Sequence, residues 1–322
     1  MKSELKPNVV GIDIGGTNSV IGLVNREGQV IATTSIKTQS YPEFNQYADA
    51  LSDAIKSLIA ANGGIDKVQG VGVGAPNANF YTGNIEYAAN LPWKGIVPFA
   101  KEISKRVGLP VALTNDANAA AIGEMTYGVA RGMKDFIMIT LGTGVGSGIV
   151  ANGQMIYGHD GFAGELGHCI VVRNGRKCGC GNCGCLETYT SATGVARTAR
   201  EFLEKRANED SLLRKIPAAD ITSKDVYDAA KAGDQMAKDI FAFTGEILGQ
   251  SLADFVKFSS PEAFVLFGGL AKSGDLLIEP IKKSMEANLM PIFRNKVKIL
   301  LSGMKEADAA VLGASALGWD AK

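Results

Sequence analysis

The sequence of 322 residues lacks an excess of charge of either sign, because 33 lysines and arginines balance 33 aspartates and glutamates. This balance gives no electrostatic reason to expect nucleic acid or an anionic membrane as a partner. Charged residues make up 20% of the chain and hydrophobic residues 46%, which excludes wholesale disorder. A chain of this length and composition is expected to form one large domain or two medium ones.

Long hydrophobic runs are also missing. The most apolar stretch, residues 136–151, is interrupted by threonine, serine and four glycines, so it predicts a buried strand and turn and no membrane span. The first 14 residues carry charges but no apolar segment ahead of the first expected strand, unlike a secretory leader. With cysteines expected to stay reduced, these absences predict a cytoplasmic protein that has no membrane partner.

Cysteine and histidine are scarce but concentrated. Four of the five cysteines fall in the eight residues 178–185, and one of the two histidines, His168, lies ten residues before them. Thiols spaced C-x-C and C-x-x-C on a glycine-rich turn, together with an imidazole, predict a tetrahedral structural zinc site. The alternatives are chance clustering and a disulfide knot, which requires an oxidising compartment; Cys178 and Cys180 are also too close in sequence to bridge comfortably.

The apolar pattern predicts an α/β fold with an internal repeat. Residues 8–36 predict a three-strand meander, and strand, glycine turn and strand recur from Asp135 onward. Two such copies with helices predict two related α/β domains that face each other across a cleft. The small-residue-rich helix expected over 306–318 is suited to close packing onto the first domain. The further elements expected are helices over 43–61, 98–107, 117–126, 193–207, 223–232, 234–257 and 277–289, and strands over 68–73, 110–114, 135–141, 147–151, 154–157 and 263–267.

Glycine is abundant, with 39 residues against 10 prolines, and it gathers at the ends of apolar strands. Three turns of this kind are Asp13-Ile14-Gly15-Gly16-Thr17, Gly142-Thr143-Gly144-Val145-Gly146-Ser147-Gly148 and Gly268-Gly269. Each alone is also compatible with an ordinary tight hairpin. The second is neither a Walker A loop nor a dinucleotide fingerprint. Together they favour a nucleotide bound across a cleft, with backbone N–H groups on its phosphates and Asp13 orienting Mg²⁺ or its waters.

Asp116 lies where an expected strand passes into an alanine-rich helix. Asparagine and aspartate are preferred helix N-caps, which is one explanation of the sequence Thr114-Asn115-Asp116-Ala117-Asn118. The other is a general base that takes the proton from an attacking hydroxyl. Both hold at once if Asn115 or Asn118 is the cap and Asp116 is free.

Two carboxylates flank the cysteine cluster: Glu165, with His168, precedes it, and Glu187 follows it. Sugar hydroxyls are donors that satisfy buried carboxylates. The alternative is that both glutamates are surface residues or hydrogen-bond partners of zinc ligands. The segment Asn90-Leu91-Pro92-Trp93 adds a carboxamide and a large ring, and a simply packed loop is the competing explanation.

As an ordered set these motifs resemble the ROK family of sugar kinases and sugar-responsive repressors, with its actin and hexokinase-like (ribonuclease H-like) fold. The motifs are GIDIGGT at 11–17, TNDANAAA at 114–121, LGTGVGSG at 141–148, GELGH at 164–168 and CGCGNCGCLE at 178–187. The resemblance implies two actin-like domains around a central cleft, with a zinc-binding loop. It places the smaller domain at residues 1–117 plus about 305–322, and the larger at 118–304.

The same resemblance implies the roles of single residues. Asp116 would be the catalytic base, Gly11–Asn18 and Gly142–Ile149 would hold the ATP phosphates, and Gly268 and Gly269 would lie near the adenosine. Asn90, Asn115, Asp116, Glu165, His168 and Glu187 would contact the sugar. Zinc would be held by His168, Cys178, Cys180 and Cys185; Cys183 has no counterpart in the family pattern, and residue types alone leave it open as a ligand.

Repressors of this family carry a DNA-binding segment ahead of the shared core. The first strand is expected at residues 9–14, so a kinase is predicted instead: ATP-dependent phosphorylation of glucose at its 6-hydroxyl. Mannose, N-acetylglucosamine, N-acetylmannosamine, allose and fructose are alternative substrates, and a catalytically silent sugar sensor is the alternative of another class. The family resemblance also implies a homodimer or homotetramer.

Overall fold

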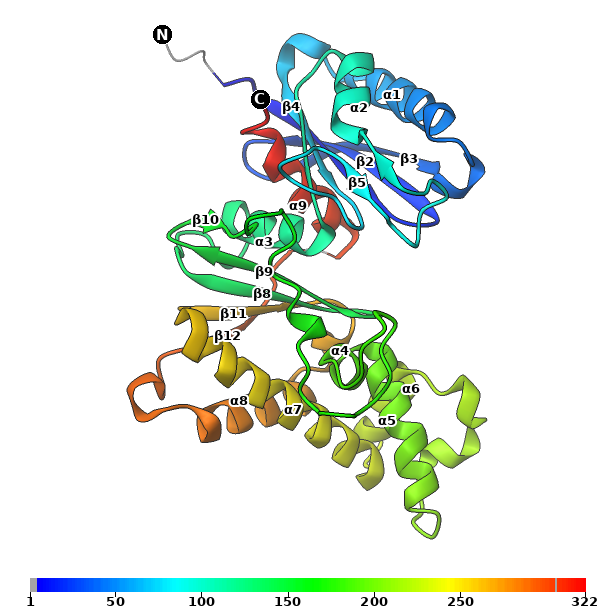
Figure 1. Cartoon of the computed structure of the whole chain (residues 1–322), viewed down its shortest axis with the longest axis vertical. Coiled ribbons are helices and arrows are strands. Elements are labelled where there is room, and N and C mark those ends of the chain that lie inside the picture. The colour runs from blue at the N-terminus through cyan, green and yellow to red at the C-terminus, as the bar shows by residue number, and fades with distance from the viewer. Residues whose placement is uncertain (1–4, 305) are drawn as a thin grey trace.

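The computed structural model describes residues 5–304 and 306–322, and two five-stranded mixed sheets organise it (Figure 1). The first sheet has the order β3-β2-β1-β4-β7. Its strands are β1 (Asn8–Ile14), β2 (Asn18–Asn25), β3 (Val30–Lys37), β4 (Val68–Gly74) and β7 (Val111–Thr114). β1, β2 and β3 form the predicted antiparallel meander, and β4 and β7 add in parallel to β1. The sequences of β1 and β4 are nearly continuous apolar runs, because both faces of the sheet are covered.

The second sheet repeats this plan, with the order β10-β9-β8-β11-β12. Its strands are β8 (Phe136–Leu141), β9 (Val145–Ala151), β10 (Gln154–Met155), β11 (Ala263–Phe267) and β12 (Lys298–Leu301). Three antiparallel strands are again followed by two parallel ones. The predicted α/β class and internal repeat are therefore confirmed. Sequence reasoning missed β12 and the two-stranded sheet of β5 (Ile85–Glu86) and β6 (Ile96–Val97).

Helices cover the sheets and separate them. They are α1 (Phe44–Ala61), α2 (Phe99–Val107), α3 (Asp116–Thr126), α4 (Glu187–Thr190), α5 (Ala192–Lys205), α6 (Ser223–Lys231), α7 (Gln235–Ser259), α8 (Asp275–Asn288) and α9 (Glu306–Gly318). α1 and α2 cover one face of the first sheet, while α3 and α9 lie between the two sheets (Figure 1). The helices α7 and α8 pack under the second sheet in a continuous hydrophobic core.

The last helix packs directly on the first sheet, as its small residues predicted. A Cβ atom on Gly11 would lie 2.2 Å from the Val311 carbonyl oxygen, and one on Gly72 would lie 1.9 Å from that of Ala314. Any side chain at these glycines would push α9 away from β1 and β4. The glycines of β4 thus permit close contact with a helix.

A fully buried carboxylate, Glu124, fastens α3 to the chain that follows β12. It accepts hydrogen bonds from the Val129 amide at 2.8 Å and from the Ser302 hydroxyl. Buried acids are costly unless they are hydrogen-bonded, so these donors fix the far end of the helix that begins at Asp116.

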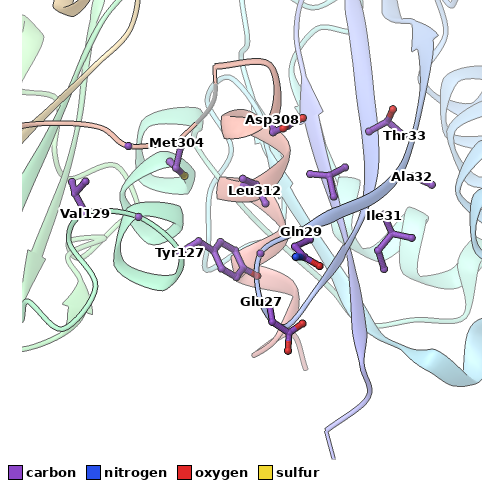
Figure 2. A pocket seen from close by; sticks show the side chains of 14 residues that line it. Glu27, Gln29, Ile31, Ala32, Thr33, Tyr127, Val129, Met304, Asp308 and Leu312 are labelled. Atoms are coloured by element: carbon purple, nitrogen blue, oxygen red, sulfur yellow. The ribbon is translucent and has the colours of Figure 1, made fainter.

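A cavity of about 810 Å³ lies between the β2–β3 turn, residues 127–129 and the start of α9 (Figure 2). Its lining includes Gln29, Tyr127 and Leu312 and none of the residues predicted for catalysis or binding. Within the described part of the chain, no helix has the length and apolar character needed to cross a bilayer.

Candidate functional site

Three parallel strands of the first sheet end side by side and carry the central carboxylates. In the register of β1, β4 and β7, Asp13 pairs with Gly74, and Gly74 pairs with Thr114. Asp13 is therefore brought to the same sheet edge as the residues that follow Thr114. Asn115 is the N-cap of α3: its side-chain oxygen accepts from the Asn118 amide at 2.7 Å. Asp116, the first residue of α3, is exposed, so the cap and a free carboxylate coexist as predicted.

The first glycine turn lies against the loop that carries Asn90. The Gly15 amide donates to the Asn18 carbonyl at 2.9 Å, which closes the turn and leaves Thr17 exposed. A Cβ on Gly16 would lie 2.8 Å from the Asn90 carbonyl oxygen, so glycine permits this approach. Asn90 itself is exposed.

In the same loop Trp93 is a core residue. It is 6% exposed, and its indole N–H donates to the Tyr41 carbonyl at 3.1 Å. The packed-loop explanation is therefore correct for the ring, while the exposed Asn90 carboxamide stays available for a ligand.

The second glycine turn is shorter than the sequence suggested. β9 begins at Val145, so Gly146 and Gly148 belong to the strand. The Gly146 amide already donates to the Thr140 hydroxyl at 3.1 Å, which leaves Gly142, Thr143 and Gly144 as the turn itself.

The start of α5 holds the second turn in place. The Ala192 amide donates to the Gly142 carbonyl at 2.8 Å, and the Thr193 hydroxyl donates to the Thr143 carbonyl at 2.8 Å. Sequence reasoning missed both residues, because nothing in a local pattern relates them to a turn 50 positions earlier.

The third glycine turn adjoins the second, because β11 pairs in parallel with β8. Gly268 has φ +103°, and a Cβ there would lie 2.6 Å from the Leu141 carbonyl oxygen, so only glycine fits without strain. A cavity of about 170 Å³ opens beside it. Its lining includes Phe267, Gly268, Leu301 and Ser302. Gly269 follows as the cap of a short 3₁₀ helix.

Four carboxylates from separate segments interact electrostatically at this site. Burial raises the pKa of Asp13 to about 6, and the negative charge of Asp116 adds to the rise. Burial also raises the pKa of Glu165; the His168 ring opposes this, while the charges of Asp116 and Glu187 reinforce it. Carboxylates that are buried near other carboxylates in this way are suited to bind a cation or hydroxyl donors.

The raised pKa of Asp13 makes a testable prediction about the protein free of Mg²⁺ and nucleotide. The folded-state pKa lies above the unfolded value of 3.8, so the free energy of unfolding falls as the pH rises from about 4 to 6. Above pH 6 this group causes no further fall. Asp13→Asn should therefore increase the free energy of unfolding at pH 8 by up to about 3 kcal/mol, and by less as the pH falls toward 4. Urea unfolding at several pH values measures this.

Asp53→Asn, on the exposed side of α1, is the matched control and should show no such pH-dependent gain. A stability difference between Asp13→Asn and the unmodified protein that stays constant from pH 5 to 8 would contradict the burial of a charged Asp13.

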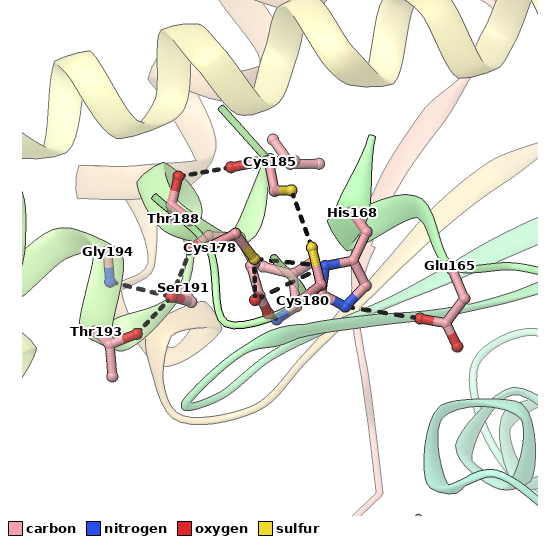
Figure 3. A network of polar contacts seen from close by, with 12 residues as sticks. Glu165, His168, Cys178, Cys180, Cys185, Thr188, Ser191, Thr193 and Gly194 are labelled. Atoms are coloured by element: carbon pink, nitrogen blue, oxygen red, sulfur yellow. Dashed lines mark hydrogen bonds and ion pairs between the residues drawn. The ribbon is translucent and has the colours of Figure 1, made fainter. Parts of the chain in front are cut away.

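The cysteine and histidine side chains converge as a metal site would require (Figure 3). The group comprises His168, Cys178, Cys180 and Cys185, whose ligand atoms all lie within 4.8 Å of one another. The sulfurs of Cys180 and Cys185 are 3.6 Å apart, and Cys178 Sγ lies 3.7 Å from His168 Nδ1. Tetrahedral zinc, with bonds of about 2.3 Å to sulfur and 2.0 Å to nitrogen, separates its ligand atoms by about 3.5–3.8 Å. This donor set therefore fits zinc.

Cys183 is exposed and stands outside this group, and all five cysteines are unpaired thiols. The disulfide alternative is thus not what the structure contains. The geometry also separates Cys183 from the other three cysteines of the cluster, which spacing alone could not do.

His168 and Glu187 connect the thiol cluster to the rest of the site. The Nδ1 atom of His168 faces Cys178, whereas its Nε2 atom lies 4.0 Å from the Glu165 carboxylate. One oxygen of Glu187 lies 3.1 Å from Cys178 Sγ, and the other accepts from the Val145 amide at 3.4 Å. A metal held by the thiols would therefore fix both an imidazole and a carboxylate beside the second glycine turn.

Arg176 supports this arrangement and was missed by sequence reasoning. It is 7% exposed, and its guanidinium forms two hydrogen bonds to Glu201, at 3.0 and 2.6 Å. It also donates to the Thr188 carbonyl at 2.7 Å and stacks 4.4 Å from the Tyr189 ring centre. The cysteine-rich loop is thereby fastened to α4 and α5. An arginine beside the cysteines is visible in sequence, but its partner 25 residues away is not.

Comparison with known proteins places these features in a family. The sequence model of the ROK family matches residues 9–321. The chain is 36% identical to a glucokinase of Halalkalibacterium halodurans, over 96% of this chain and 93% of that protein. It is 32% identical to a glucokinase of Thermotoga maritima, over 97% of both chains. A crystal structure of a ROK family glucokinase from Streptomyces griseus, in complex with glucose and AMPPNP, superposes with a TM-score of 0.78 at 34% identity, covering 97% of this chain and 99% of that one.

Proposed function

The chain belongs to the ROK family, and from that premise we propose that it is an ATP-dependent hexokinase that phosphorylates glucose at the 6-hydroxyl. The observation that carries this proposal is the place of Asp116. It is exposed at the first turn of α3 and interacts electrostatically with Asp13 and Glu165. It also lies at the edge of the first sheet where β1 leads into the first glycine turn. The two glucokinases and the glucose complex described above support the choice of substrate.

Asp116 is the proposed general base. It would accept the proton of the sugar hydroxyl as the oxygen attacks the γ-phosphorus in line. The Ala117 amide donates to its Oδ1 at 2.9 Å, which fixes the carboxylate and leaves its second oxygen for the sugar. The helix N-terminus also favours the negative charge.

Around the base, Asn90, Asn115, Glu165, His168 and Glu187 are the proposed sugar contacts. They come from both sides of the site: Asn90 and Asn115 from the first sheet and its loops, and the other three from segments that follow β10. The carboxylates accept from ring hydroxyls, the Nε2–H of His168 donates to one, and burial strengthens each such bond. Closure around the sugar and ATP would exclude water as a competing acceptor.

The ATP phosphates are proposed to lie on Gly15, Gly16, Thr17 and Asn18 of the first turn and on Gly142, Thr143 and Gly144 of the second. Gly146, whose amide is paired with Thr140, is no longer proposed as a phosphate contact. Gly268 and Gly269, beside the cavity of about 170 Å³, would adjoin the adenosine. No lysine occurs in either phosphate turn. Asp13, half-buried with a raised pKa, suits Mg²⁺, which supplies charge neutralisation at the phosphates when bound.

The zinc assignment rests on the fit of His168, Cys178, Cys180 and Cys185 to a tetrahedral ion. Its proposed role is structural: it would fix the ring of His168 and the loop that ends at Glu187.

Three further features stay predictions: a homodimer or homotetramer, a cytoplasmic location, and a division into residues 1–117 plus about 305–322 and residues 118–304. The two five-stranded sheets support that division.

The proposed function is tested by coupled ADP release against glucose, mannose, allose, fructose, N-acetylglucosamine and N-acetylmannosamine. Turnover on glucose far above the other sugars is the expected result. A strong preference for an N-acetylated sugar would replace the substrate and keep the mechanism. No turnover on any sugar, with sugar binding retained, would favour the silent sensor.

A further inference from the structure

The segment after β4 and the segment after β10 meet in a contact that the assigned chemistry does not use. The rings of Phe80 and Tyr157 stack with their centroids 4.0 Å apart and their planes 3° from parallel. Phe80 follows a strand of the first sheet, and Tyr157 follows a strand of the second. The stack therefore joins parts of the protein that belong to different sheets.

A buried amide, Asn79, strengthens the same contact. It is 2% exposed, and its Nδ2 donates to the Asp160 carbonyl at 2.7 Å, across to the second segment. Its Oδ1 accepts from the amides of Tyr81 and Thr82, at 3.0 and 3.3 Å, within its own segment. Gly161, with φ +91°, faces this amide so closely that a Cβ would lie 2.5 Å from Asn79 Oδ1. The two segments thus pack so closely that no side chain at position 161 would fit between them.

Tyr157 also reaches the strand that leads to the proposed base. Its hydroxyl lies near the side chain of Thr114, the last residue of β7. Thr114 in turn accepts from the Asn118 side-chain amide at 3.2 Å, and both residues are 1% exposed. Thr114 and Asn118 are each two residues from Asp116, so the contact extends to the backbone on both sides of it.

The segment that carries Tyr157 is anchored to β9 of the second sheet at both of its ends. The Ile156 amide donates to the Ile149 carbonyl at 2.8 Å, and the Leu166 amide donates to the Ser147 hydroxyl at 3.2 Å. Glu165 lies in this segment, just before the second anchor. Asn90 lies ten residues after Phe80 in the first segment, against Gly16.

We propose that Asn79, Phe80 and Tyr157 form a clasp of positioning residues between these two segments. The clasp holds the segment that carries Asn90 against the segment that carries Glu165 and leads to His168, and so sets the affinity for the sugar. This inference rests on the proposed function, because the proposed function makes the sugar a ligand of both segments. None of the three clasp residues belongs to the glycine turns proposed for ATP. Loss of the clasp should therefore weaken sugar binding and leave nucleotide binding nearly unchanged.

The test uses Phe80→Leu, which keeps an apolar side chain but removes the flat stack, and Phe80→Tyr, which keeps the stack. With the full-length protein and glucose as the varied substrate, Phe80→Leu should raise KM for glucose about tenfold, the scale of one aromatic pair. KM for ATP and kcat should each change by less than about twofold. Phe80→Tyr should restore KM for glucose. Phe258→Leu, the same change at a ring that is 88% exposed on α7, is the matched control.

A double variant distinguishes a shared contact from two separate effects. If Phe80 and Tyr157 act through their stack, Phe80→Leu combined with Tyr157→Leu should raise KM for glucose little more than the larger single change. Unchanged KM for glucose in folded Phe80→Leu overturns the proposal. A fall in kcat with KM for glucose unchanged, together with lower thermal stability, overturns it as well, because that is the signature of a merely structural residue.

A readout without turnover separates failure of the clasp from failure of the proposed function. Hydrogen exchange of the amides in residues 156–164 should be faster in Phe80→Leu than in Phe258→Leu, even if no sugar in the panel is phosphorylated. Equal exchange in the two variants would show that the stack does not hold this segment and would overturn the clasp.

Discussion

Replacing Asp116 with asparagine should lower kcat by about 10²- to 10⁴-fold, the contribution of a positioned general base. Asparagine has the same shape and keeps an oxygen that can accept from the Ala117 amide, as Asp116 does at 2.9 Å. It cannot take the proton of the attacking hydroxyl. KM for glucose should therefore change by less than about tenfold, while turnover nearly stops. Coupled ADP release with glucose varied at saturating ATP measures both constants.

Two controls make this result specific to proton transfer. Asp53→Asn, exposed on α1, should be as active as the unmodified protein. Glucose binding by Asp116→Asn, followed by titration calorimetry, should persist. An Asp116→Asn protein with kcat within a few-fold of the original would refute the assignment of the base. The search for it would then turn to Glu165 and Glu187, the other acids that interact at the site.

Replacing Cys178 with serine should remove the bound metal and most of the activity. Cys178 is 5% exposed and contacts both His168 and Glu187, so its loss disconnects the thiol cluster from the site. Zinc content should fall from about one ion per chain to nearly none, because a closed structural site needs all four ligands. We expect kcat/KM for glucose to fall at least about 100-fold, since His168 and the loop ending at Glu187 lose their support.

Cys183→Ser is the matched control for this prediction. Cys183 lies in the same loop but is exposed and outside the group of converging ligands, so zinc content and activity should be retained. Metal analysis by mass spectrometry together with the coupled assay gives both readings. Full loss of zinc in Cys183→Ser, with zinc retained in Cys178→Ser, would require a different ligand set.

Most helices and strands follow from local patterns. The helix expected over 43–61 is observed over Phe44–Ala61, and that over 306–318 is observed as Glu306–Gly318. Regular spacing of apolar residues decides such elements, because a helix or strand must bury one face. Elements without their own periodicity were missed, among them β12 and the four-residue helix α4. Their stability comes from pairing with β11 and from the cysteine-rich loop.

The sequence also indicated the groups that the structure brings together at the candidate site, because glycine turns, capping residues and cysteine spacing are local requirements of the backbone or of a metal. It could not locate residues whose role depends on a distant partner. Gly72 faces α9 rather than a ligand, the Gly146 amide is already paired with Thr140, and the partner of Arg176 lies on α5.

By itself the sequence determined the α/β class with its repeated strand–glycine turn–strand pattern, and the groups from which the candidate ligands come, since these depend on local patterns of residues. Only the tertiary structure decided that Asn115 is the cap, that Cys183 stands apart from the other thiols, and that Phe80 stacks on Tyr157. The physical reason is that strand register, and helix packing through glycine, bring together side chains that are far apart along the chain. A local pattern specifies which groups a segment offers, and packing specifies which groups they meet.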